Sequence, residues 1–187
     1  LLTSLSKTGV IYAKTIGSHF AGNNNLLTGD LYFPELVEMT GSDHFKPTKI
    51  TSFRAPKLKA VAAYCFDGVS TLEYVELSEV CTVIGDRGFQ NCSSLTNITL
   101  FSTIEKIDAY AFSGCSKLVN APVIPNSVTN MTNTFYRCYN LINAPVIPNN
   151  VTNMRSTFYG CSNLVNAPVI PNRVTNMYST FYGCNKL

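Results

Sequence analysis

The chain has 187 residues, of which 45 % are hydrophobic and 13 % charged, and its formal net charge is +3. This composition is typical of a folded protein and argues against disorder. No apolar run approaches the ~18 residues of a membrane span, and the opening LLTSLSKTGV lacks the basic segment followed by a long apolar one of a signal peptide.

The charges are unevenly distributed along the chain. Residues 1–108 contain nine of the 14 Lys and Arg residues and all 11 acidic residues, a balance of −2, whereas residues 109–187 contain five basic residues and no acid, a balance of +5. The second half could serve an anionic partner, or it could be a solvated surface with few charges. Because nucleic-acid footprints cluster more Lys and Arg, the solvated surface is favoured and a nucleic-acid partner is not expected.

A repeat runs through almost the whole chain and is clearest in its phenylalanines. Their spacings are 25 and 21 residues, which together make two periods, followed by 23 residues five times. A fixed period of this length indicates a stack of similar units. The repeated phenylalanines are Phe20, Phe45, Phe66, Phe89, Phe112, Phe135, Phe158 and Phe181.

Each unit contains an apolar pattern that predicts a short strand. Taken in chain order, the segments are Leu27–Leu31–Phe33 (with one inserted residue), Ile50–Phe53–Ala55, Leu72–Val75–Leu77, Leu95–Ile98–Leu100, and then Leu118–Ala121–Val123 with its copies at 141–146 and 164–169. The last three segments each add an asparagine and match L-x-x-L-x-L-x-x-N, the sequence pattern of a leucine-rich repeat. Alternating side chains turn inward, and stacking builds one parallel sheet.

The remainder of each unit should return on the other side of the stack. The stretch Ala-Tyr-Ala-Phe-Ser-Gly-Cys at 109–115 predicts a helical turn closed by Gly114. The expected fold is a right-handed leucine-rich-repeat solenoid with a single parallel β-sheet on one face and short helical or irregular returns on the other. It forms one domain over 1–187, with a partial unit at 1–26, divergent units at 27–117 and three near-identical units at 118–187, the last truncated.

The prolines of the last three units are expected on the outer side of their strands. Pro122, Pro145 and Pro168 stand at the outward centre in this register, where the missing N–H breaks one ladder bond per unit. The sheet should therefore be shorter or more irregular there than at 72–77 and 95–100.

Two of the repeated stretches carry a family resemblance. The pattern F-x-x-C-x-x-L at 89–95 and 112–118, together with residues 104–112, resembles the BspA-type leucine-rich repeat family over about residues 20–187. The resemblance implies a secreted or surface protein of host-associated bacteria, and several members act as adhesins that bind host matrix proteins or other microbes. The family has no shared catalytic residues. The chain departs from it in its Ala-Pro-Val-Ile-Pro segments, where larger aliphatic residues are usual.

Cysteines form a second column at the same period. A metal column is disfavoured, since no C-x-x-C occurs and the two histidines are distant in sequence. Disulfides between units are disfavoured because stacked side chains point the same way, so buried free thiols acting as small apolar groups are favoured. Cys65 and Cys81 are expected in the core or in turns. The structural columns are Phe89, Phe112, Phe135, Phe158 and Phe181, and Cys92, Cys115, Cys138, Cys161 and Cys184.

Asn126, Asn149 and Asn172 follow the last three strands. Each amide is expected to bond backbone groups of neighbouring units at the turn, a structural role.

No catalytic arrangement emerges from the sequence. Neither His19 nor His44 belongs to a nucleophile pattern, and no phosphate-binding, lipase-type or metalloprotease motif occurs. The absence of any carboxylate from 109–187 excludes paired-acid glycosidase chemistry there. The expectation is a protein that is not an enzyme and that uses no cofactor and no metal.

Outward strand positions are the candidates for partner binding. Tyr32, Arg54, Tyr74 and Glu76 share a face and are expected to contact a protein or glycan, since Tyr and Arg suit binding hot spots. Phe101 with Ile124, Ile147 and Ile170 predicts an exposed apolar strip, which is either a binding site or a surface covered by another segment or copy.

The favoured function is a binding module for adhesion, located outside the cell or at a bacterial cell surface. The alternative is a structural or assembly protein, for instance of a virion tail or surface layer, in which solenoids stack. No polar cap follows the last unit, so either more chain follows or another subunit completes the stack, the second alternative being self-association through that edge.

Overall fold

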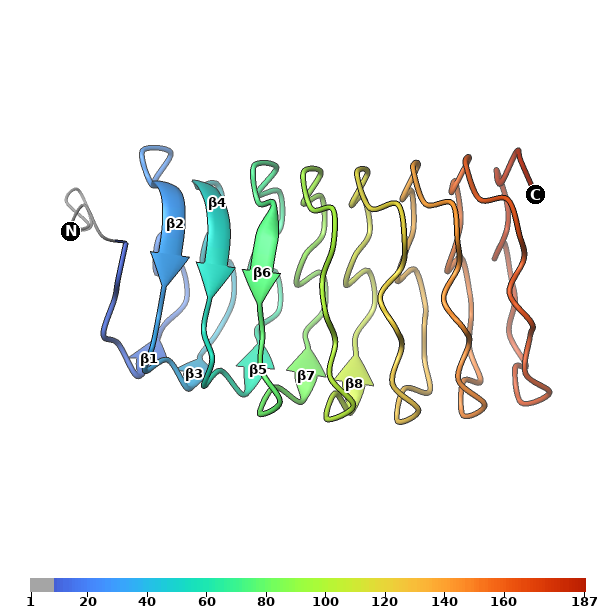
Figure 1. Ribbon diagram of the computed structural model, residues 1–187, viewed down its shortest axis with the longest axis horizontal. Coiled ribbons are helices and arrows are strands. Elements are labelled where there is room, and N and C mark those ends of the chain that lie inside the picture. The colour runs from blue at the N-terminus through green and yellow to red at the C-terminus, as the bar shows by residue number, and fades with distance from the viewer. Residues whose placement is uncertain (1–8) are drawn as a thin grey trace.

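The computed structural model describes residues 9–187 as an elongated array of stacked units, with β1 near one end of the array and residue 187 at the other (Figure 1). Residues 1–8 of the partial unit expected at 1–26 lie outside the described residues. The described part contains no helix. Its strands are β1 (Thr15–Ile16), β2 (Thr28–Tyr32), β3 (Glu38–Met39), β4 (Lys49–Arg54), β5 (Ala60–Val61), β6 (Tyr74–Glu76), β7 (Val83–Ile84) and β8 (Lys106–Ile107).

The strands form two rows, not the single sheet expected from the sequence. One row is the parallel sheet β2-β4-β6. The other contains the parallel pair β1-β3 and the parallel sheet β5-β7-β8, which belong to the return segments (Figure 1). The leucine-rich-repeat solenoid is therefore confirmed, but short strands and turns replace the helical returns.

Left-handed backbone on either side of the repeated phenylalanine explains why the returns are not helical. The residue two positions before Phe66, and before each later repeated Phe, has φ between 51° and 58°. The residue two positions after each of these Phe residues has φ between 56° and 75°, and this combination ends any right-handed helix. Gly114 is one of these positions, at φ 71°, and closes a turn. The residues are Tyr64, Arg87, Tyr110, Asn133, Ser156 and Ser179 before, and Gly68, Asn91, Gly114, Arg137, Gly160 and Gly183 after.

A continuous stack of phenylalanine rings runs through the core. From Phe45 to Phe181 the successive ring centroids are 5.0–5.9 Å apart and the rings are within 13° of parallel. Phe33 and Phe53 of the strand segments pack against the start of this stack. The rings from Phe45 to Phe158 are fully buried, so each unit covers an aromatic face of the unit before it.

The cysteine column lies beside the phenylalanine stack as free thiols. Each thiol from Cys92 onward donates a hydrogen bond to the backbone carbonyl of the repeated Phe in the preceding unit, with sulfur–oxygen distances of 3.1–3.2 Å. Cys65 and Cys81 are also free and buried. Burial raises the pKa of the Cys115 and Cys138 thiols well above the ordinary range. These thiols are neutral packing groups that also donate to a buried carbonyl.

The register of the last three strand segments differs from the expectation by one residue. Pro122 and Ile124 face the core, while Val123 is 81 % exposed. The extra residue is visible in the spacings: Val128 and Met131 follow Ile104 and Ile107 by 24 residues, although the phenylalanines remain 23 apart. One residue is thus gained in the strand segment and one is lost before Phe135.

On the strand side, the parallel pairing of strands ends after β6, before the first of the proline-containing segments. Residues 95–100 form no strand, and in the last three units the strand side retains only the bridges Asn120–Asn143 and Asn143–Asn166. The expected shortening at the proline units occurs, but with Pro122 and Pro145 buried and not on the outer face.

The neighbouring residues Val123 and Ile124 provide a test of this register. Replacing Ile124 with Ala should cost about 2–5 kcal/mol, because it removes a buried side chain and leaves a cavity. Replacing Val123 with Ala should change the free energy of unfolding by less than about 0.5 kcal/mol, because its side chain packs against little. Denaturant unfolding of the two variants measures both values, and the reverse order would support the register expected from the sequence.

The thiols provide a second test. All seven should react with a thiol reagent in denaturant without prior reduction, whereas in the native protein only half-exposed Cys184 should react readily. The free energy of unfolding should fall as the pH rises above the ordinary thiol pKa of about 8.5, because unfolded thiols release protons that the buried thiols retain. Replacing Cys138 with Ala should lessen this slope, and fewer than seven reactive thiols in denaturant would instead indicate disulfides.

Candidate functional site

The strands β2, β4 and β6 present one polar and aromatic surface, here called the strand face. Tyr32 pairs with Arg54, which pairs with Glu76, so these three side chains lie side by side across the sheet. Tyr74 stands in the neighbouring column, beside Ser52 and two residues before Glu76. Alternation along each strand places these side chains outward while Phe53 and Val75 fill the core.

Contacts within and between the strands hold several of these side chains in place. The Arg54 guanidinium lies 4.9 Å from the centroid of the Tyr32 ring, a cation–π contact. The Tyr74 hydroxyl lies 3.4 Å from a carboxylate oxygen of Glu76. The Ser52 hydroxyl donates to the Asp30 carboxylate at 2.7 Å. The strand face is thus partly ordered before any ligand arrives.

A groove opens where the sheet ends. It has a volume of about 280 Å³ and lies between β6, which contributes Tyr74 and Glu76, and residues 96–101, which contribute Asn97, Thr99 and Phe101. Within residues 9–187, the backbone N–H groups of Asn97 and Thr99 have no protein acceptor. The loss of ladder pairing after β6 therefore leaves a concave site with an aromatic residue on each side and donors between them.

The isoleucines expected on this surface are not part of it. Ile124 is 5 % and Ile147 4 % exposed, and Ile170 is partly buried against the core. Their expected exposure is wrong, because the extra residue in each segment reverses the alternation. The outward positions belong to three valines with exposures of 81–90 %, and the last two help to line an apolar groove of about 320 Å³. They are Val123, Val146 and Val169. The 24-residue spacing to Val128 is the sequence signal that identifies them.

The asparagines at the strand ends do not have the predicted role. Asn126, Asn149 and Asn172 are exposed, and within residues 9–187 their side chains form no hydrogen bond. Other asparagines bond instead. The side chains of Asn130, Asn153 and Asn176 each accept the backbone N–H two residues on, and Asn143 donates to Asn120 across units. An Asn before a turn readily accepts the backbone N–H two residues later, so the position of these asparagines before a turn is the sequence signal for their bonds.

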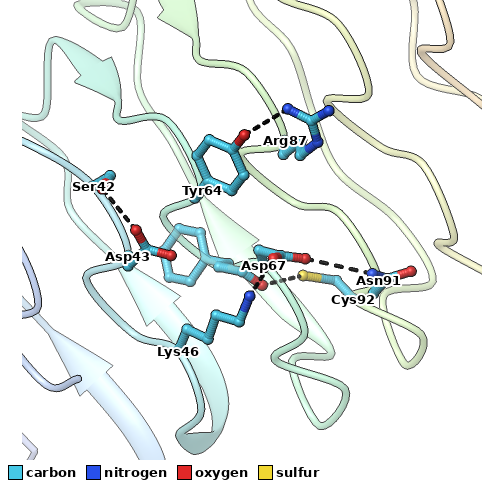
Figure 2. A network of polar contacts seen from close by, with 9 residues as sticks. Ser42, Asp43, Lys46, Tyr64, Asp67, Arg87, Asn91 and Cys92 are labelled. Carbon is cyan, nitrogen blue, oxygen red and sulfur yellow. Dashed lines mark hydrogen bonds and ion pairs between the residues drawn. The ribbon is translucent and has the colours of Figure 1, made fainter. Parts of the chain in front are cut away.

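The return side of the earlier units carries a network of polar pairs (Figure 2). Lys46 donates to the Asp67 carboxylate at 2.7 Å, and Asn91 donates to the same carboxylate at 3.4 Å. The hydrogen bond to Asp67 raises the pKa of Lys46. Arg87 donates to the Tyr64 hydroxyl at 2.6 Å. Each of these bonds joins neighbouring units, so the network aligns the turns.

Residues 9–187 contain no cluster of His, Cys, Asp and Glu side chains able to hold a metal ion. The same part of the chain has no helix long and apolar enough to span a membrane.

The stacked units, the parallel strand face and the aromatic core define a leucine-rich-repeat solenoid. The chain belongs to the BspA type leucine rich repeat region family, whose model matches residues 11–73 and 59–187 in six copies. A comparison with curated proteins found no match.

Three solved structures are similar in fold. A leucine rich cell surface protein from Faecalibacterium prausnitzii A2-165 aligns with a TM-score of 0.69 and 24 % identity, over 87 % of this chain and 45 % of that one. The T. pallidum leucine rich repeat protein aligns at 0.61 and 22 %, over 93 % and 83 %. A leucine-rich repeat protein from Bacteroides ovatus aligns at 0.57 and 18 %, over 91 % and 51 %. The chain thus spans less than half the length of the Faecalibacterium protein.

The contact between Tyr32 and Arg54 leads to a prediction about stability. A double-mutant cycle with Tyr32→Ala and Arg54→Ala should give a coupling energy of about 0.5–1 kcal/mol, typical of an exposed cation–π pair. Denaturant unfolding of the four proteins measures it. A control cycle between Tyr32 and the distant Arg155 should couple by less than about 0.5 kcal/mol, and equal coupling in both cycles would contradict the contact.

Proposed function

We propose that this protein is a non-enzymatic binding module that recognises a protein or glycan through its strand face. The observation that carries the proposal is the groove between β6 and residues 96–101, with Tyr74, Glu76 and Phe101 at its walls. Beside it lie Tyr32 and Arg54, already stacked on one another. Concave sites with a few convergent polar groups are typical of binding sites.

The chemistry of the strand face suits recognition better than catalysis. Tyr and Arg contribute much of the binding energy at protein interfaces, and side chains that are ordered beforehand lose less conformational entropy on binding. The groove also combines a carboxylate, two aromatic rings and backbone donors. A ligand with hydroxyl or amide groups and one apolar or aromatic group would complement it.

We further propose that the module acts outside the cell or at a bacterial cell surface, in adhesion. Membership of the BspA-type family supports this location, as does the similarity in fold to a protein described as a leucine rich cell surface protein. Adhesion is consistent with a repeat array, which offers an extended surface to a large partner.

Binding measurements with a strand-face variant test the proposal. The wild-type protein is screened against purified host matrix proteins and a glycan array, and the best ligand is titrated. Replacing Tyr32, Arg54, Tyr74 and Glu76 with Ala should weaken that ligand's binding at least about a hundredfold, because it removes the aromatic and charged anchors together. Unchanged binding by the folded variant would overturn the proposed site.

A matched control changes exposed residues outside the groove. The control variant replaces Glu105, Lys117 and Tyr139 with Ala, so that it also loses an acid, a base and an aromatic ring. It should bind like the wild-type protein. Equal loss in both variants would indicate a general effect of surface composition and not a site.

A second candidate function is assembly with further copies of the chain, as in a surface layer or virion tail. The observation that favours it is the row of valines at Val123, Val146 and Val169, each more than 80 % exposed. Sedimentation over a range of concentrations tests it: association that Val146→Thr weakens would support assembly, and a monomer at every concentration would exclude it.

A further inference from the structure

The return side of the last three units contains another groove, far larger than that of the strand face. Its volume is about 640 Å³, and polar groups dominate its lining. Tyr136, Tyr159 and Tyr182 form one wall, and Thr132, Arg155 and Tyr178 line it as well. We call it the return groove. The proposed function on the strand face does not use it.

Small side chains create the return groove. The left-handed position two residues before each repeated Phe holds Tyr64, Arg87 and Tyr110 in the earlier units, and there Arg87 fills the surface, 5.1 Å from the Tyr64 ring and 4.7 Å from the Tyr110 ring. In the later units the same position holds Asn133 and Ser156, followed by Ser179, and all three line the groove. Replacing large side chains with small ones leaves the space open.

The tyrosine wall repeats along the groove at a regular interval. The ring centroids of Tyr136 and Tyr159 are 4.8 Å apart, and those of Tyr159 and Tyr182 are 4.9 Å apart, with the rings nearly parallel. Arg155 lies 5.4 Å from the Tyr178 ring centroid, which restrains its guanidinium. Successive units therefore offer equivalent hydroxyl groups along one line.

The polar floor of the return groove has unused hydrogen-bonding groups. Asn133 and Ser156 are each only 8 % exposed and both line the groove. Within residues 9–187 neither side chain forms a hydrogen bond to another protein group, and neither is among the buried polar atoms shut off from solvent. A ligand that brings hydroxyl groups to this floor can therefore replace solvent as the hydrogen-bond partner of both side chains.

The charge of the groove selects an anionic ligand. Arg155 is the charged residue in its lining, and Arg137 stacks on Tyr136 at 5.2 Å. Residues 109–187 contain no carboxylate to oppose them. One arginine among hydroxyl and amide groups is too sparse for a nucleic acid, whose binding sites cluster Lys and Arg, and the polar lining does not suit an apolar peptide.

We propose that the return groove binds an acidic polysaccharide. Hydroxyl groups of the sugar bond to Asn133, Ser156 and the tyrosine hydroxyls, and a sulfate or carboxylate group pairs with Arg155. A polymer of repeating sugars suits this surface because each unit of the solenoid presents the same tyrosine to it.

Binding of dextran sulfate, with uncharged dextran as its counterpart, tests the proposal. Arg155→Ala should weaken dextran sulfate binding about tenfold or more, as expected for a charge-assisted hydrogen bond. Arg173→Ala removes the same charge from an exposed residue that does not line the groove, and should change binding less than about twofold. Equal effects of the two changes, or equal binding of dextran, would overturn the proposal.

Filling the groove gives an independent test. Ser156→Tyr introduces a tyrosine at the position that Tyr64 and Tyr110 occupy in the earlier units, so this backbone conformation accommodates it. The variant should lose dextran sulfate binding while its thermal unfolding stays unchanged. Ser179→Ala, at the same position in the next unit, should retain most of the binding. Retained binding in a folded Ser156→Tyr protein, or tighter binding of poly-uridylate RNA than of dextran sulfate, would exclude an acidic polysaccharide site in this groove.

The strand-face variant separates this proposal from the preceding one. The variant with Ala at positions 32, 54, 74 and 76 should bind dextran sulfate like the wild-type protein, because the strand-face groove and the return groove share no residue. Loss of dextran sulfate binding in that variant would place the polysaccharide on the strand face.

Discussion

The stacking of one phenylalanine per unit is the constraint on which the rest of this structure depends. Centroids 5.0–5.9 Å apart from Phe45 to Phe181 allow the units to approach nearly as closely as hydrogen-bonded strands, which lie about 4.8 Å apart. Each ring is covered by the ring of the next unit, so a unit whose Phe is displaced along the chain would leave two aromatic faces uncovered. This explains why an extra residue in one segment is matched by a missing residue before the next Phe.

The turns around that phenylalanine determine what each unit shows to solvent. Left-handed residues two before and two after the ring prevent a helix, and the position two before the ring lies on the return side. In the earlier units this position and its neighbours form pairs such as Lys46–Asp67 and Tyr64–Arg87, which close the surface. The later units keep the same backbone with smaller side chains, and the return groove results. Similar backbones thus support two different surfaces.

The two faces also differ in how they are ordered. On the strand face, pairing between β2, β4 and β6 aligns Tyr32, Arg54 and Glu76, and the groove begins where that pairing stops. On the return side, the stacked tyrosines themselves form the wall, and no strand is needed there. The strand-face groove and the return groove each arise where a repeated interaction is interrupted or reduced, while the phenylalanine stack continues through the core.

Residue type and spacing alone specify the period, the inward phenylalanines and the alternation in the earlier units. That was sufficient to align Tyr32, Arg54 and Glu76 in advance. It was not sufficient for Ile124, because Ala121 and Pro122 are both small enough to face the core, and the extra residue between Ile104 and Val128 can be placed only once the stacked units show that Ile124 is buried. The strands in the returns, the strand-face groove and the return groove likewise follow only from the tertiary structure. They depend on the distance between units and on the sizes of side chains that meet only when the units stack.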